Sequence, residues 1–151
     1  MRHVHAEARV EAPVKHVFDL ACDPERLPEW NPYQRIDDVR GPLDHVGTTL
    51  APTLTLLGHE VHSLAVVTEV VRNRLVRIHG TGPAGGHSEW TYRFEPDGDA
   101  TRWSIDVDYE MPGVMRGVVD LLVYHGALER ATRHMTENFA AVAEAKVPLL
   151  A

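Results

Sequence analysis

The stretch that decides the fold runs from Val114 to Ala145 and reads VMRGVVDLLVYHGALERATRHMTENFAAVAEA. Apolar residues recur in it at steps of three and four, which predicts one long amphipathic helix. The inward stripe consists of Val118, Leu121, Leu122, His125, Leu128, Met135, Phe139 and Val142. Charged side chains occupy the opposite face of this helix. The rest of the chain must therefore supply a surface that covers the apolar stripe.

Composition limits the class of protein. The chain has 151 residues, of which 44% are hydrophobic and 25% charged, so we expect one globular domain over residues 1–151. The net charge of −7 and the scattered Lys and Arg residues argue against nucleic-acid binding. A single cysteine, Cys22, fits a reducing compartment, and no signal peptide or run of about 18 apolar residues is present. We therefore expect a cytoplasmic protein that does not insert into membranes.

The first thirty residues predict a strand followed by a corner. Alternating residues share one face of that strand: Val4, Ala6, Ala8, Val10 and Ala12. Pro13 presets a first helical turn, and apolar residues then follow at helical spacing up to Asp23. Asp23 can cap a second short helix that begins at Pro24 and is limited by Pro28.

From Tyr33 to Tyr109 the pattern is that of six β-strands separated by turn residues. The last two strands flank the Pro96–Asp99 turn and should form a hairpin with coinciding aromatic faces. Pro52 interrupts the second of the six strands and indicates either an edge strand or a bulge. The stretch His59–Val71 has apolar residues on both parities, so its inward face stays open.

Short turns between successive strands make them antiparallel neighbours, because a parallel return needs a long crossover. The expected fold is α+β, with a curved antiparallel sheet of seven strands. A sheet with one apolar face can bury it by wrapping around the long C-terminal helix. This is a helix-grip fold with two short helices after the first strand.

Two segments near the N-terminus and one hairpin carry a family resemblance. Val10–Phe18 and Asp23–Trp30 are similar to the N-terminal signature of the polyketide cyclase/dehydrase branch of the START-like (SRPBCC) superfamily. The turn Glu95–Arg102 resembles the acidic, glycine-containing turn of that branch. The resemblance covers essentially the whole chain. Its motifs are structural, so they identify a fold family and not a reaction.

The resemblance implies a cavity between sheet and helix that holds a hydrophobic small molecule, such as a polyketide or a lipid-like metabolite. Aromatic walls with a few polar groups suit such a ligand. The expected ligand-binding residues are Trp30, Tyr33, Leu54, Leu56, His62, Ile78, Trp90, Tyr92, Trp103, Ile105, Tyr109, Leu121, Leu122, Tyr124, His125 and Leu128. The alternative for each aromatic residue is ordinary packing in the core.

His125 is the candidate catalytic base, because its position in the apolar stripe points it at the sheet. An imidazole can move protons near neutral pH, as an aldol cyclisation or a dehydration requires. The alternative is a core histidine that is hydrogen-bonded to a tyrosine or to backbone. Tyr124, Tyr92 and His62 are secondary candidates for polar groups in the cavity.

Other histidine and glycine patterns suggest no cofactor. His3 and His5 share a strand face, and His59 lies near His62, but neither HExxH nor a cysteine pattern accompanies them, so we expect no metal. The GxGxxG spacing that begins at Gly80 lacks a following helix and indicates a hairpin loop.

Three functions remain open: a polyketide cyclase or dehydrase, a non-catalytic carrier or sequestering (resistance) protein for a lipid or antibiotic, and an interaction module with a vestigial cavity. His125 within hydrogen-bond reach of a tyrosine or carboxylate would favour the enzyme. A continuous apolar cavity without that pair would favour the carrier, and a collapsed cavity the interaction module. Flexing of the Met111–Gly117 segment is the expected route for ligand exchange. The sequence does not predict the oligomeric state.

Overall fold

The computed structural model describes residues 2–82, 85–110 and 118–145. Its strands are β1 (Arg2–Val10), β2 (Gln34–Arg40), β3 (Thr49–Leu56), β4 (His59–His62), β5 (Leu64–Val71), β6 (Leu75–Thr81), β7 (His87–Asp97) and β8 (Ala100–Glu110). Its helices are α1 (Val14–Ala21), the 3₁₀ turn η1 (Pro24–Arg26), α2 (Leu27–Trp30) and α3 (Val118–Glu144). None of the described helices is long and apolar enough to cross a membrane.

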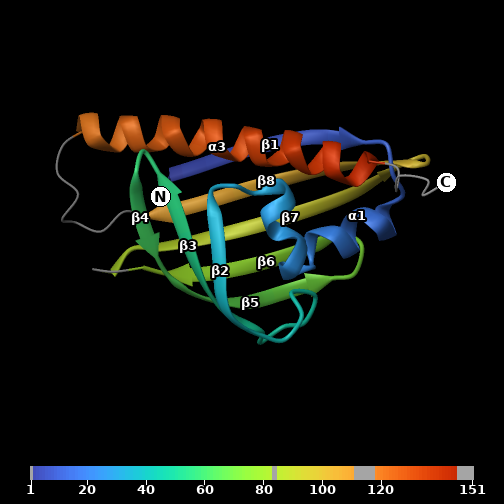
Figure 1. The fold of residues 1–151 in the computed structure, drawn as a ribbon, viewed down its shortest axis with the longest axis horizontal. Helices are drawn as coiled ribbons and strands as arrows, with labels where there is room; N and C mark the ends of the chain where they lie inside the picture. The colour runs from blue at the N-terminus through green and yellow to red at the C-terminus, as the bar shows by residue number, and fades with distance from the viewer. Residues whose placement is uncertain (1, 83–84, 111–117, 146–151) are drawn as a thin grey trace.

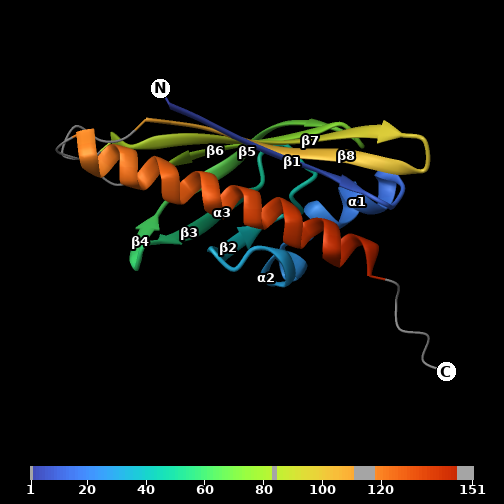
Figure 2. The ribbon, with the colours of Figure 1, turned by 90° about the horizontal axis from the view of Figure 1, so that it is seen from above.

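The strands form one curled antiparallel sheet in the order β1-β8-β7-β6-β5-β3-β2, and the short β4 pairs with β3 beside this path. Helix α3 lies across the open side of the curl, against β1 at one edge and near β3 and α2 at the other (Figures 1 and 2). The sheet thus buries its concave face against one helix, as the amphipathic pattern requires. The expected helix-grip fold is confirmed.

The corner after β1 follows from local chemistry. Pro13 precedes α1 with an extended backbone, and the carboxylate of Asp23 accepts a hydrogen bond from the backbone N–H of Glu25 at 3.0 Å. That bond satisfies one donor of the η1 turn, as an N-cap does. Helix α2 then ends at Trp30, whose side chain is fully buried beneath α3.

The stretch expected to be one strand near His59–Val71 is two strands, β4 and β5, separated at Ser63. Strand β3 pairs with β5 through Thr49 and Leu50 and with β4 from Thr53 onward. The carbonyl oxygen of Pro52 accepts from the backbone N–H of Ser63, so Pro52 turns its missing N–H to the side where the partner of β3 changes, and the β2–β3 ladder continues past it. Since β3 also pairs with β2, Pro52 does not mark an edge strand.

The β7–β8 hairpin has the expected register. Phe94 lies opposite Trp103, and Tyr92 lies opposite Ile105, with all four side chains buried. Gly98 in the connecting turn has a φ of 62°, a conformation that favours glycine. The aromatic side chains of the hairpin therefore face α3 together.

Candidate functional site

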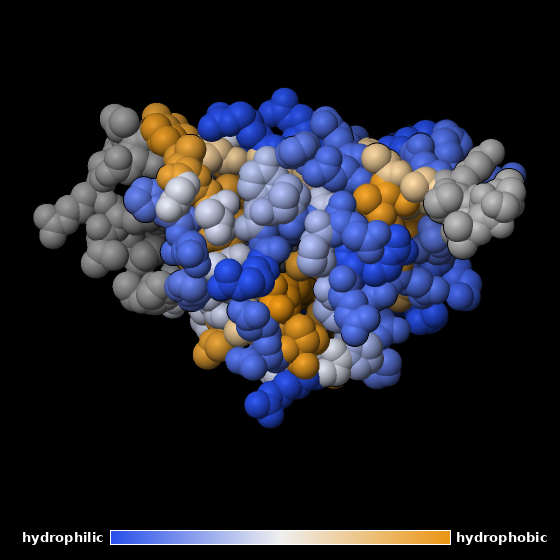
Figure 3. Space-filling model, viewed as in Figure 1, coloured by the Kyte–Doolittle hydropathy of each residue, from blue (hydrophilic) through white to orange (hydrophobic). Residues whose placement is uncertain are grey.

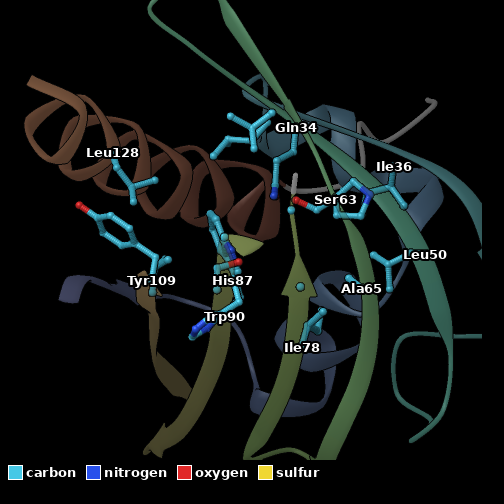
Figure 4. A pocket seen from close by; sticks show the side chains of 18 of the residues that line it. Gln34, Ile36, Leu50, Ser63, Ala65, Ile78, His87, Trp90, Tyr109 and Leu128 are labelled. Carbon is cyan, nitrogen blue, oxygen red and sulfur yellow. The ribbon is translucent and has the colours of Figure 1, made fainter. Parts of the chain in front are cut away.

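A cavity of about 210 Å³ lies between the sheet and the first half of α3. Figure 4 shows Leu50, Ile78 and Leu128 pointing into this space from β3, β6 and α3. Its wall is predominantly apolar. The volume exceeds the roughly 150 Å³ of a cavity that admits benzene and lies below the range of about 300–1,000 Å³ for drug-sized ligands. A compact molecule, or the buried part of a longer one, fits it. Figure 3 shows apolar residues recessed between polar ones on the face that carries β2 and β3.

Seven residues expected to contact a ligand border this cavity. They are Leu54, Ile78, Trp90, Tyr92, Tyr109, Tyr124 and Leu128. They come from β3, β6, β7, β8 and α3, so the curl of the sheet gathers residues that are far apart in the sequence. Their contact with a ligand stays a prediction.

Three buried residues on the expected list lie outside the cavity because other side chains cover them. Trp103 stacks on Phe139 of α3 with ring centroids 3.9 Å apart, and Trp30 packs edge-on against both rings. Ile105 is fully buried next to this cluster on β8. The packing alternative holds for these residues, which form the solid part of the core.

Four more expected residues lie elsewhere. Leu56 is buried near the end of β3 without bordering the cavity, and Leu121 is half-buried on α3. Tyr33 lies outside the cavity, where its hydroxyl is 2.8 Å from Nδ1 of His134. The ring of His62 is two-thirds exposed and lies 2.9 Å from the hydroxyl of Thr53.

The expectation that Leu122 faces the sheet is wrong, because its side chain is 57% exposed. At 100° per residue, Leu122 lies about 120° around the helix from the buried Leu128. The side of α3 that meets the sheet is centred on Leu128, Met135 and Phe139. The stripe predicted from spacing was therefore too wide at its N-terminal end.

His125 lies on the flank of α3, with about a fifth of its side chain exposed, and does not itself border the cavity. Its Nδ1 lies 2.7 Å from the hydroxyl of Tyr109, which does border it. Its Nε2 lies 3.0 Å from a carboxylate oxygen of Glu129, one turn further along α3. The sequence spacing of His125 and Glu129 could have indicated this pair.

The three groups can form a continuous hydrogen-bonded chain. When His125 donates its Nε2–H to Glu129, its Nδ1 is free to accept the hydroxyl proton of Tyr109. Burial raises the pKa of Tyr109 to about 12, so this phenol is protonated at neutral pH. Burial also raises the pKa of Tyr124, whose ring meets that of Tyr109 edge-on. The cavity therefore has two neutral hydroxyl groups on the side of α3.

Sequence reasoning missed several polar groups at the cavity. Gln34 projects into it from β2 (Figure 4), and its carbonyl oxygen accepts a hydrogen bond from the buried Asn31 at 2.9 Å. This bond occupies the oxygen and leaves the Gln34 amide N–H groups as donors toward the cavity. His87 and Glu110 border the rim as a pair with 2.9 Å between Nε2 and Oε2. Only the strand register, which joins His87 to Glu110, could have identified this pair.

Small residues form the wall opposite α3. Ala65, Gly80 and Ser88 line the cavity from β5, β6 and β7. A Cβ atom at Gly80 would lie 3.3 Å from the hydroxyl of its cross-strand neighbour Ser88, a tight approach that favours glycine at this position. These short side chains create the empty volume. The Met111–Gly117 segment, expected to admit ligands, lies outside the described residues.

The sequence matches the family described as polyketide cyclase / dehydrase and lipid transport over residues 1–144. No curated protein matches it significantly. Among solved structures, the Zhui aromatase/cyclase from Streptomyces sp. R1128 is 15% identical with a TM-score of 0.81, covering 98% of this chain and 96% of that one.

Two further structures have the same fold. Protein TTHA0849 from Thermus thermophilus is 20% identical with a TM-score of 0.79, and the match covers 94% of this chain and 97% of the other. A START superfamily protein from Mycobacterium smegmatis is 18% identical with a TM-score of 0.72, covering 93% and 98%. At these identities the structures establish the fold alone. The family match and the apolar cavity together support a role in binding hydrophobic small molecules. This chain belongs to the polyketide cyclase/dehydrase and lipid transport family.

Proposed function

We propose that the protein binds a compact hydrophobic metabolite of polyketide type and transfers protons to and from it during cyclisation or dehydration. The observation that carries this proposal is the chain from Tyr109 at the cavity through His125 to Glu129. A phenol at an apolar wall, connected to an imidazole and a carboxylate, is a suitable general acid–base unit. The catalytic role expected for His125 thus becomes an indirect one.

The chain supplies protons in both directions. Tyr109 can take a proton from an activated carbon of the ligand as its own hydroxyl proton passes to Nδ1 of His125. Glu129 stabilises the resulting imidazolium, as a carboxylate does in a catalytic triad. The resulting carbanion attacks a second carbonyl of the ligand, and reversal of the proton transfer protonates the new alkoxide. No redox change or additional reactant is needed.

The cavity contributes orientation. Leu54, Ile78 and Trp90 offer apolar and aromatic contact to a flat molecule, while the Gln34 amide can donate to one carbonyl oxygen. Holding two reacting carbons of a flexible chain near each other lowers the entropic barrier to ring closure. Exclusion of water from the apolar wall protects reactive intermediates.

A carrier or sequestering function is the second candidate, and the observation that favours it is the predominantly apolar wall of the cavity. Tight retention of a lipid or antibiotic needs no acid–base unit. The two functions share the cavity and differ in their dependence on Tyr109.

Tyr109→Phe tests the proposal, because it removes one oxygen and retains the ring. We expect the affinity for a poly-β-keto thioester analogue, measured by calorimetry, to stay within a few-fold of wild type. The rate of ring formation, followed by absorbance of the aromatic product, should fall by about a hundredfold or more. His125→Ala should produce a similar loss.

The chain provides matched controls. Tyr33 and His134 form a second tyrosine–histidine pair on the outside of α3, so His134→Ala removes an equivalent imidazole away from the cavity. It should leave the rate unchanged. Equal rates for wild type, Tyr109→Phe and His125→Ala, with ligand still bound, would refute the acid–base assignment and leave the carrier function.

A further inference from the structure

Two histidines and two aspartates face each other across the first and last strands, far from each other in the sequence. In the antiparallel register of β1 and β8, His3 lies opposite Asp108 and His5 lies opposite Asp106. Val4, between the histidines, is buried in the core. Because side chains alternate along a strand, the four polar residues share the outer face of the sheet. This outer-face cluster is separate from the cavity.

The cluster has the spacing of metal ligands. Asp106 Oδ1 lies 2.7 Å from His5 Nδ1 and 3.1 Å from His3 Nε2. One ligand atom from each of the three residues lies within 4.8 Å of the others. A tetrahedral zinc ion with bonds of about 2.0–2.1 Å holds neighbouring ligand atoms roughly 3.3 Å apart. Small rotations of exposed side chains therefore suffice to place all three on one ion.

Both ring nitrogens of His3 lie beside carboxylate oxygens. Its Nδ1 lies 2.7 Å from Asp108 Oδ1, while its Nε2 lies 3.1 Å from Asp106 Oδ1. A neutral imidazole carries only one N–H, so it can donate to one of these carboxylates and must turn a lone pair toward the other. A metal ion between Nε2 and Asp106 would replace this unfavourable contact with two coordinate bonds.

The groups around these three residues are arranged like those that hold the ligands of a metal ion in place by hydrogen bonds. Asp108 accepts from Nδ1 of His3, which is the contact that fixes a metal-binding histidine in its tautomer and orientation. Glu7 Oε2 lies 3.6 Å from the distal nitrogen of His5. Arg93 Nε lies 3.7 Å from the second oxygen of Asp106 and leaves Oδ1 free for the ion. Three carboxylates against one guanidinium make this surface favourable for a divalent cation.

We propose that His3, His5 and Asp106 form a binding site for a divalent transition metal ion, with zinc the best match to two imidazoles and a carboxylate. Solvent completes the coordination. The ion joins β1 to β8 on the face opposite the cavity. The sequence pattern of His3 and His5 alone did not predict a metal, because the third ligand comes from the other end of the sheet.

The test uses untagged protein that has been dialysed against a chelator and titrated with zinc chloride by calorimetry at pH 7.5. We expect one zinc ion to bind per chain, and cobalt to give the visible absorption of a tetrahedral site. His3→Ala/His5→Ala should lower zinc affinity by about a hundredfold or more. Asp108→Asn, which touches only the outer ligand contact, should lower it by roughly tenfold.

The chain offers a matched control for this histidine pair. The control His59→Ala/His62→Ala removes two exposed histidines of β4 and should leave zinc affinity unchanged. Absence of zinc binding, or binding that persists in His3→Ala/His5→Ala, would overturn the proposal. Neither result bears on the cavity, so this site and the proposed function are tested independently.

Discussion

Helix α3 packs on one sheet, but its two halves meet different surfaces. Near its C-terminal end, Phe139 stacks on Trp103 with ring centroids 3.9 Å apart and meets Trp30 edge-on, and Met135 is also fully buried. Nearer its N-terminal end, Leu128 faces the cavity. We call the region around Phe139 the solid half of the core, and the region around Leu128 and the cavity the hollow half.

Side-chain size opposite the helix explains the difference. The solid half sets aromatic rings of α2 and β8 against Phe139. In the hollow half, Ala65 and Gly80 of the sheet line the cavity together with Leu128 of α3. Since interiors normally pack densely, an apolar space of this kind costs stability and suggests a use for it. The comparison assigns stability chiefly to one half and ligand binding to the other.

The largest expected effect is on stability in the solid half. Trp103→Ala removes a fully buried ring that stacks on Phe139 and should lower the free energy of unfolding by about 3–5 kcal/mol. Trp90→Ala, in the hollow half, should cost clearly less, because one side of that ring already faces empty space. Urea denaturation of both variants measures this. Equal losses in the free energy of unfolding for Trp103→Ala and Trp90→Ala would contradict the assignment of a solid and a hollow half.

The same substitution in each half gives a matched pair. Ala131→Phe should lower the free energy of unfolding by about 1–3 kcal/mol, because Ala131 is fully buried on α3 where no space is left. Ala65→Phe places its ring in the cavity and should change stability less. It should instead weaken binding of a hydrophobic probe by tenfold or more, as measured by fluorescence titration. Unchanged probe binding in Ala65→Phe would contradict the assignment of the cavity.

Much of the fold was predictable because it depends on spacing along the chain. The alternation around Trp90 and Trp103 predicted the hairpin and its inward face, and the three- and four-residue steps predicted α3. Pattern alone could not divide β4 from β5, because that break depends on which strand pairs with β3. Spacing likewise overestimated the width of the inward stripe at Leu122.

The site was less predictable than the fold. An inward aromatic residue can border a cavity, as Tyr109 does, or pack solidly, as Trp103 does, and both have the same sequence periodicity. The outcome depends on the size of residues on distant strands. Contacts such as Tyr109 with His125, or His3 with Asp108, join residues whose proximity follows only from the register and the path of α3.

The smallest expected effect is a pH dependence of the free energy of unfolding. In the folded protein, burial raises the pKa of Cys22 from 9.0 to about 12. Between these values the unfolded chain alone releases the thiol proton, so the free energy of unfolding falls as pH rises from about 9 toward 12. The raised pKa of Tyr109 adds a similar decrease in the free energy of unfolding between about pH 10 and pH 12.

Thermal melts of wild type and Cys22→Ala at pH 8 and pH 10 isolate the thiol contribution. The decrease in Tm between these pH values should be smaller in Cys22→Ala than in wild type. An identical decrease in both proteins would show that the thiol is not protected by burial.

The three tryptophans allow a direct test of where a ligand binds. Trp90 borders the cavity, while Trp30 and Trp103 belong to the solid half. In a ¹H–¹⁵N NMR titration with a hydroxynaphthoquinone, assigned through Trp90→Phe, the indole N–H signal of Trp90 should shift most. The signals of Trp30 and Trp103 should stay nearly in place. A bound ligand that shifts Trp30 and Trp103 instead, or the absence of any binding by planar aromatic ligands, would contradict the account.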